Sequence, residues 1–174
     1  MGRGLIQHGA TTGGVCNSGT WLRNDAPFQD LSPTASCLQV QSYVAAVFSA
    51  SSSSVLAELK MQALATALHV YFSDPSLGGN TLGAPAPIGN YSVDLTHVCL
   101  MKDSSATGAG TCTGTVGSSS NAFSGATQLT VSQMLATSSS FCHAGGTAWY
   151  SNSATQALAK NAFDAVNNQK ARAP

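Results

Sequence analysis

Residues 55–80 read VLAELKMQALATALHVYFSDPSLGGN. Over residues 55–72 this sequence predicts one long helix that is apolar around most of its circumference. Its polar side chains fall on one narrow stripe, formed by Glu58, Gln62, Thr66 and His69. So narrow a polar stripe is typical of a helix that other elements surround at the centre of a core. Ser73-Asp74-Pro75 and the glycine pair that follows are signals that end the helix.

Two residues of this predicted central helix, Lys60 and His69, have side chains with ionisable groups, which need an explanation beyond core packing. Because Lys60 stands near the start of the helix, we expect its methylene stem to lie along apolar neighbours and its ammonium to reach water. His69 ends the polar stripe, where a partly buried, hydrogen-bonded histidine is the ordinary interpretation. Its imidazole is also a weak candidate for a catalytic base.

Three further helices are predicted by a capping box placed ahead of an apolar run at helical spacing. The boxes are Ser36-x-x-Gln39, Thr130-x-x-Gln133 and Ser153-x-x-Gln156. In each box the two side chains can satisfy backbone N–H groups that the first turn of a helix leaves without partners. We therefore expect helices to begin at these three positions.

Residues 91–101 allow two interpretations. Ser92-Val93-Asp94 could cap a short helix that runs to Met101, with Asp94 suited to the positive end of the helix dipole. Residues 91–99 also alternate between apolar and polar side chains well enough for a strand. Of the two, we favour the helix.

Together these patterns predict a mainly α protein, a single compact helical domain with long Gly/Ser-rich loops and room for a short β-hairpin. Residues 1–35 are rich in Gly, Thr and Asn and predict an irregular N-terminal segment that packs on the domain, with space for one short helix. The helical domain then occupies residues 36–174.

The chain is unusually poor in charge, with 8% of Asp, Glu, Lys and Arg against about 25% in average proteins. Seven basic and seven acidic residues cancel, so no charge pattern predicts binding to nucleic acid or to an anionic membrane. No apolar run reaches the roughly 20 residues of a membrane span. A surface of neutral polar residues is typical of secreted or cell-surface domains. Residues 1–4 do not begin a signal peptide, so we expect any export signal upstream of Met1.

Five cysteines are scattered along the chain, which in a charge-poor sequence favours disulfides in an oxidising compartment. Cys99 and Cys112 are the first expected pair, since the Gly- and Ser-rich loop between them folds back easily. Cys16 and Cys37 are the second, by proximity, which leaves Cys142 as the odd thiol. The alternative is that all five are reduced and buried. No Cys/His spacing matches a zinc site, so we expect neither a metal nor a cofactor.

Serine-hydrolase chemistry is the sharpest enzymatic hypothesis, because serines are abundant and four histidines could act as bases. No Gly-x-Ser-x-Gly elbow supports it, however. His143 is a second weak catalytic candidate beside His69. Its neighbour Cys142 is better interpreted as a loop cysteine than as a nucleophile, since a catalytic Cys and its His are rarely adjacent in sequence.

Trp149 and Tyr150 follow the glycine pair Gly145-Gly146 and are candidate binding residues. An exposed aromatic pair of this kind is what carbohydrate-binding surfaces use. The alternative, that both rings pack over the core, is the commoner fate of large aromatic side chains.

Several stretches resemble a recurrent, functionally uncharacterised domain of large secreted and surface proteins of bacteria. They are SCLQVQSYVAAVF (36–48), MQALATALHVYFSDPSLGGN (61–80), APAPIGNYSVDLTHVC (84–99), FSGATQLTVSQML (123–135) and GGTAWYSNSATQALAKNAFDAVNNQ (145–169), with a weaker match at GRGLI (2–6). In those proteins the domain sits beside Ig-like or repeat B-type modules of adhesin-like chains. The Gly-Phe-Trp-type opening usual in that domain is absent here. The resemblance implies a surface or secreted location and neighbouring domains, and it transfers no catalytic residue.

We therefore expect a non-enzymatic extracellular module of a bacterial surface or secreted protein, with a structural role or a binding role toward carbohydrate or another protein. The alternative is a small secreted hydrolase that acts on a polymer substrate.

Overall fold

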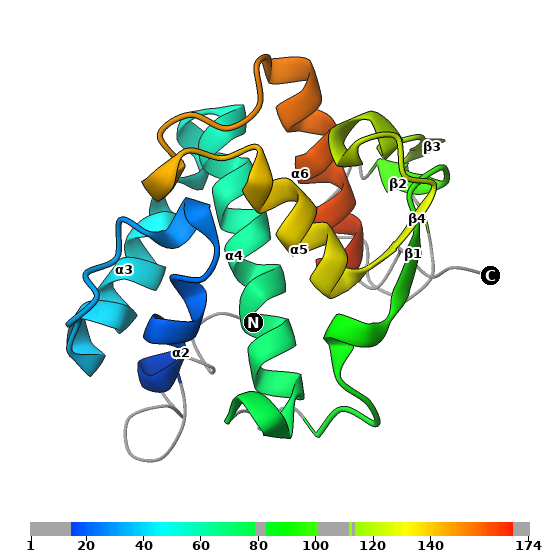
Figure 1. Cartoon of the computed structure of the whole chain (residues 1–174). Coiled ribbons are helices and arrows are strands. Elements are labelled where there is room, and N and C mark those ends of the chain that lie inside the picture. The colour runs from blue at the N-terminus through cyan, green and yellow to red at the C-terminus, as the bar shows by residue number, and fades with distance from the viewer. Residues whose placement is uncertain (1–14, 79–82, 101–111, 113, 169–174) are drawn as a thin grey trace.

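Helix α4 (Val55–Ser73) runs through the middle of the molecule, and the other elements pack around it (Figure 1). The computed structural model describes residues 15–78, 83–100, 112 and 114–168. Ten of the 19 residues of α4 are buried, so this helix is the core element that its narrow polar stripe predicts. Ser54 caps its first turn by accepting a hydrogen bond from the backbone N–H of Ala57, and Asp74 follows its last residue.

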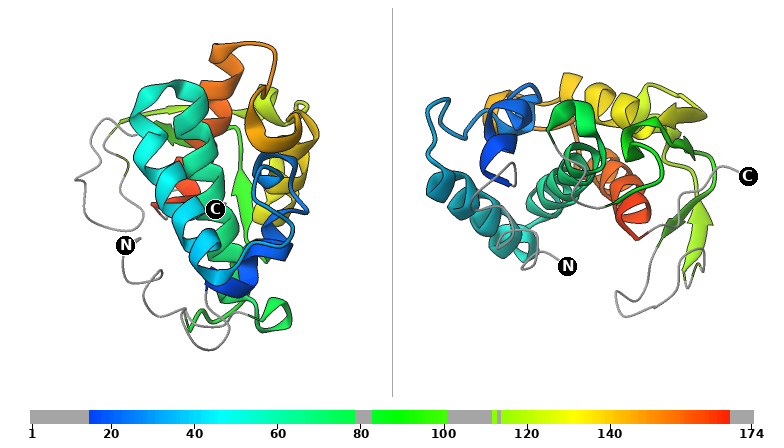
Figure 2. Two further views of the ribbon diagram at one scale, coloured as in Figure 1. Left: turned by 90° about the vertical axis from the view of Figure 1, so that its left-hand side faces the viewer. Right: turned by 90° about the horizontal axis from the view of Figure 1, so that it is seen from below.

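The described part of the chain is mainly α, as predicted. Its helices are α2 (Val15–Leu22), α3 (Cys37–Ala50), α4, α5 (Val131–Ser140) and α6 (Ser153–Asn167). Single 3-10 turns lie at η1 (Ala26–Phe28), η2 (Ser51–Ser53), η3 (Pro75–Leu77), η4 (Ile88–Asn90), η5 (Ser120–Phe123) and η6 (Ala144–Gly146). Figure 2, in the view from below, shows α4 between α3 on one side and α6 on the other. None of the helices described is both long and apolar enough to cross a membrane.

Two of the three predicted capping boxes are confirmed. Ser36 and Gln39 satisfy each other's backbone N–H groups at the start of α3, and Thr130 and Gln133 do the same at α5. The third prediction is wrong, because Asn152 and not Ser153 caps α6.

At α6 the Asn152 side chain accepts a hydrogen bond from the backbone N–H of Thr155, at 2.8 Å. Asparagine is as good a cap as serine, and a start one residue earlier places Gln156 beyond the position from which it could reach back to the cap. Gln156 instead donates a hydrogen bond to the backbone carbonyl of Trp149, also at 2.8 Å.

The predicted helix from Ser92 to Met101 is also wrong; its described residues form strands, and Met101 lies outside them. Strands β1 (Ser92–Asp94) and β4 (Gln128–Thr130) form one antiparallel pair, and β2 (Val98–Leu100) and β3 (Thr115–Gly117) form the other. Asp94 accepts hydrogen bonds from the backbone and hydroxyl of Thr96, at 2.8 and 2.6 Å. An aspartate that bonds two residues ahead favours a turn, and this turn separates β1 from β2.

The N-terminal segment packs on the domain through α2 and η1, with Leu22 and Phe28 fully buried. This agrees with the predicted short helix, while residues 1–14, which include His8, lie outside the described part. A disulfide between Cys16 and Cys37 joins α2 to the first residue of α3.

The second disulfide joins Cys99, in β2, to Cys112. Both predicted pairs are therefore confirmed. Cys142 is the free cysteine, also as predicted.

Candidate functional site

The polar stripe of α4 faces α6 and forms a hydrogen-bonded interface with it. Gln62 donates to a carboxylate oxygen of Asp164 at 2.9 Å, and the Thr66 hydroxyl donates to the Asn167 side chain at 2.9 Å. The Asn167 amide in turn donates to the side-chain oxygen of Gln62 at 2.7 Å. The stripe therefore holds two helices together in register.

His69 belongs to this interface. Burial lowers the pKa of its imidazole, and a hydrogen bond with Asn167 opposes that shift. The ring is thus a packed member of the α4–α6 contact, which agrees with the ordinary interpretation of a histidine on such a stripe.

Lys60 does not send its ammonium to water, so that prediction is wrong. The side chain is only 14% exposed, and its Nζ lies 2.6 Å from Asp30 Oδ2 and 2.8 Å from the carbonyl oxygen of Gly145. Tyr43 donates its hydroxyl to the other carboxylate oxygen of Asp30 at 2.6 Å. A partly buried ammonium is stabilised by such partners, and here they come from segments distant in sequence.

Cys142 lies close to this cluster. Burial raises the pKa of its thiol to about 11, although the positive charge of Lys60 acts in the opposite direction. The thiol donates a weak hydrogen bond to the carbonyl of His143 at 3.2 Å. Because the thiolate is the nucleophile, a thiol with so high a pKa is poorly suited to covalent catalysis near neutral pH.

The loop 141–150 is folded back on itself. Cys142 and Trp149 form an antiparallel bridge, and the backbone N–H of Tyr150 donates to the carbonyl of Phe141 at 3.2 Å. Gly145 and Gly146 turn the chain with φ values of 84° and 73°, a region that favours glycine. The bridge and the glycine turn therefore fix the backbone positions of the aromatic residues in this loop.

Trp149 and Tyr150 differ in their exposure. Trp149 is 1% exposed, and its indole N–H donates to the carbonyl of Ser138 at 2.8 Å. Tyr150 is half-buried, and its hydroxyl donates to the carbonyl of Ala122 at 3.0 Å and lies 3.0 Å from Ser138 Oγ. Of the predicted aromatic pair, Trp149 is a core residue, and Tyr150 is half-buried against the core with part of its side chain exposed.

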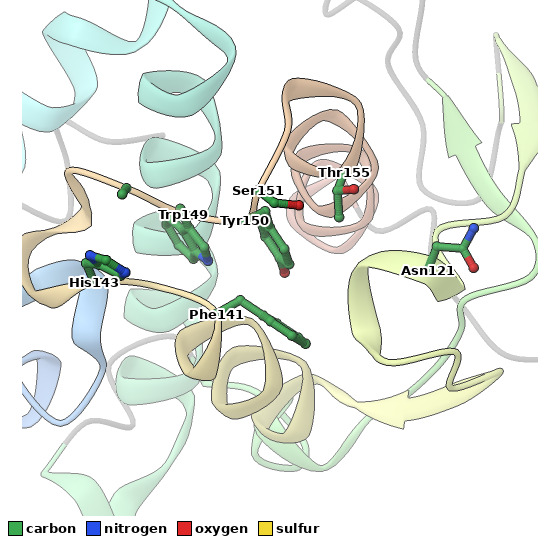
Figure 3. A pocket seen from close by; sticks show the side chains of 8 residues that line it. Asn121, Phe141, His143, Trp149, Tyr150, Ser151 and Thr155 are labelled. Carbon is green, nitrogen blue, oxygen red and sulfur yellow. The ribbon is translucent and has the colours of Figure 1, made fainter.

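An open hollow of about 490 Å³ lies at this loop (Figure 3). The residues that line it are Asn121, Phe141, His143, Ala148, Trp149, Tyr150, Ser151 and Thr155. Figure 3 shows Asn121 and His143 at opposite ends of the view, with Phe141 and Tyr150 between them. Phe141 is 41% exposed, and its ring stacks on Tyr150 with centroids 5.2 Å apart.

The histidines within the described ranges lie at separate places. His69 is in the α4–α6 interface, His143 is exposed at the hollow, and His97 contacts Thr96 and Asp94 in the turn after β1. None of these three is hydrogen-bonded to a serine and an acid at once. Nor do three His, Cys, Asp or Glu side chains converge as metal ligands would in the described part.

The sequence predictions missed Phe141, Asn121 and Thr155 as residues of the hollow. Phe141 directly follows the last residue of α5, and this aromatic residue at the end of a helix was the one local feature that could have indicated the site. Asn121 stands in a Ser-rich segment and Thr155 in the first turn of α6, and neither position has a local signal for a site.

Comparison of the chain with protein-family models, with curated proteins and with solved structures finds no match in any of the three. Function is therefore inferred from the geometry of the hollow and from the charge and cysteine chemistry of the chain.

Proposed function

We propose that this chain is a non-enzymatic extracellular module of a bacterial surface or secreted protein, and that the hollow at Phe141 and Tyr150 is its binding surface. One observation carries the proposal: the hollow combines the stacked rings of exposed Phe141 and half-buried Tyr150 with neutral polar side chains. Concave sites with apolar walls and a few polar groups are where proteins commonly hold ligands. Carbohydrate or a partner protein is the expected ligand.

The arrangement of titratable groups favours binding over catalysis. A hydrolase that uses serine needs a histidine within reach of the serine and an acid that orients it. His69 lies with Asn167 in the α4–α6 interface, and within the described ranges neither His69 nor His143 is hydrogen-bonded to a serine and an acid at once. The hydrolase alternative therefore has no geometric support among the described residues.

Extracellular location is supported by the two disulfides, because disulfides persist in oxidising compartments. Thiol titration of the unfolded protein from its native compartment tests it. We expect one reactive thiol without reductant and five with it. Five thiols without reductant would contradict the extracellular placement.

The catalytic alternative is tested by profiling the purified protein against ester, glycan and peptide substrates. We expect no turnover of any class. A hydrolysis that disappears in a His143→Ala or His69→Ala variant, and persists in the control variant His97→Ala, would overturn the non-enzymatic proposal.

A further inference from the structure

We infer that the hollow takes a neutral saccharide, with one sugar ring lying against the exposed face of Phe141. The inference rests on the proposed binding function and names the ligand class of the same site. Aromatic, amide and hydroxyl groups meet there, and no Asp, Glu, Lys or Arg is among the described residues that line it.

Phe141 provides the apolar platform. Its ring is 41% exposed on a charge-poor surface, and it stacks on Tyr150 with an angle of 27° between the planes. Tyr150 is in turn parallel to the buried ring of Trp149, at 4° between the planes. The three rings are stacked in a row from the buried Trp149 to the exposed Phe141. The Phe141 ring is therefore held in position before a ligand binds. The C–H face of a sugar ring is apolar and fits such a surface.

The backbone at Tyr150 supports this role. Its φ of 56° lies in the left-handed region, which is unfavourable for a tyrosine. The hydrogen bond from its hydroxyl to Ala122 and the ring contacts with Phe141 and Trp149 hold the ring in place. Backbone strain of this kind clusters at ligand-binding positions, where it aims a side chain.

Polar groups that match sugar hydroxyls surround the platform. The exposed Asn121 side chain makes no hydrogen bond within the described part, so both its amide donor and its carbonyl acceptor are available. Thr155 donates its hydroxyl to Asn152 at 3.0 Å and keeps an acceptor position free. Ser151 Oγ accepts from Asn152 at 3.3 Å and can still donate. Donors and acceptors in this mixture suit hydroxyl groups, each of which needs both.

The charge of the site selects a neutral ligand. Among the described residues that line the hollow, His143 is the one whose side chain can become cationic, and it lies at the end opposite Asn121 (Figure 3). Phosphates and carboxylates are typically held by Arg or Lys in bidentate or charge-assisted hydrogen bonds. Because neither Arg nor Lys is in the described lining, we expect an acidic saccharide to gain nothing over a neutral one.

Titration with defined oligosaccharides tests the inference. The neutral probes are cellotetraose, mannotetraose and chitotetraose, and the acidic ones are sialyllactose and an oligogalacturonate. The readout is the nitrogen–proton correlation spectrum, in which the indole signal of Trp149 reports from beneath the hollow. A Trp21→Phe variant assigns it, since the chain has two tryptophans. We expect at least one neutral probe to bind and to shift this signal, and the acidic probes to bind no better.

Variants then locate the site. Phe141→Ala should weaken binding about tenfold or more through loss of stacking, and Phe141→Trp should retain it. Asn121→Ala, on the exposed surface, should also weaken binding. Tyr91→Ala is the matched control, because Tyr91 is 46% exposed and does not line the hollow, and it should bind like the native protein. Circular dichroism confirms that each variant is folded.

The inference would be overturned if no neutral probe binds, if acidic probes bind more tightly, or if Phe141→Ala and Asn121→Ala bind like the native protein. Binding of a purified protein ligand that depends on Phe141, with no saccharide bound, would also overturn it but would leave the proposed binding function standing. Conversion of a neutral probe to products would overturn the non-enzymatic proposal while supporting a saccharide as the ligand.

Discussion

The Nζ atom of Lys60 lies 2.6 Å from Oδ2 of Asp30, and this ion pair connects α4 to the segment between η1 and α3. The same ammonium donates to the carbonyl of Gly145, so it also holds the loop that frames the hollow. Lys60 therefore links three segments of the chain.

Replacement of Lys60 by Met should lower the free energy of unfolding by about 1 to 2 kcal/mol, because it leaves the Gly145 carbonyl without a donor. The half-exposed carboxylate of Asp30 keeps the loss at the lower end for an ion pair. Urea denaturation measures the change. The control is Lys160→Met, which removes the longer pair with Glu58, at 3.5 Å, and should cost less than about 1 kcal/mol. Equal losses in the two variants would contradict the special role of Lys60.

Gly145 must remain glycine. Its φ is 84°, and an added Cβ would lie 3.1 Å from the Cβ of Asp30. A Gly145→Ala variant should lose about 2 kcal/mol of stability, from the left-handed backbone and the close contact together. Gly125→Ala is the matched control, since φ there is 78° with nothing within 4 Å of the added atom. It should lose only about 1 kcal/mol by thermal or urea unfolding.

Cys142 should react with iodoacetamide slowly and with an unusual pH profile. With the pKa of its thiol raised to about 11 by burial, the alkylation rate of the folded protein should still rise about tenfold per pH unit between about pH 8 and 10. Lys60→Met should slow the reaction further, because the lysine charge acts to lower this pKa. A rate that levels off near pH 9 would contradict the assigned environment.

His69 should make the protein less stable as the pH falls. Its pKa is below the ordinary 6.5 in the folded state, so above that pH the ring is neutral both folded and unfolded and has no effect. Below it the unfolded chain takes the proton first, and unfolding is favoured.

A His69→Gln variant isolates that contribution. Asp25, whose pKa burial raises to about 6, and Asp164, whose pKa burial also raises, act in the opposite sense and remain in both proteins. Relative to the native protein, the variant should therefore gain stability between about pH 7 and 5. His143→Gln controls for the loss of an exposed imidazole. The prediction would be refuted if the free energy of unfolding changed with pH in the same way in the native protein and in His69→Gln.

The parts of the fold that could be predicted are those with local signals. The local signals are the period of α4, the boxes at Ser36 and Thr130, and the small sequence separation of Cys99 and Cys112. At α6 a local rule failed, because Ser153 follows an equally good cap. The helix predicted from Ser92 was also wrong, because aspartate is common both at helix starts and in turns, and Asp94 is in a turn.

The site could be predicted only in part. Tyr150 was expected at a binding surface, and it lines the hollow. Asn121 and Phe141 come close to Tyr150 because η5 packs against α5, and no short-range sequence pattern predicts that contact. For the same reason the partner of Lys60, 30 residues away at Asp30, could not be predicted from the helix alone.

The central claim is that this hollow binds a neutral saccharide without changing it. The most direct measurement is calorimetric titration of the native protein and Phe141→Ala with the tightest neutral probe, followed by chromatography of the recovered probe. We predict binding that is weakened about tenfold in the variant, and a probe recovered intact. Equal affinity in both proteins, or a cleaved probe, would contradict the claim.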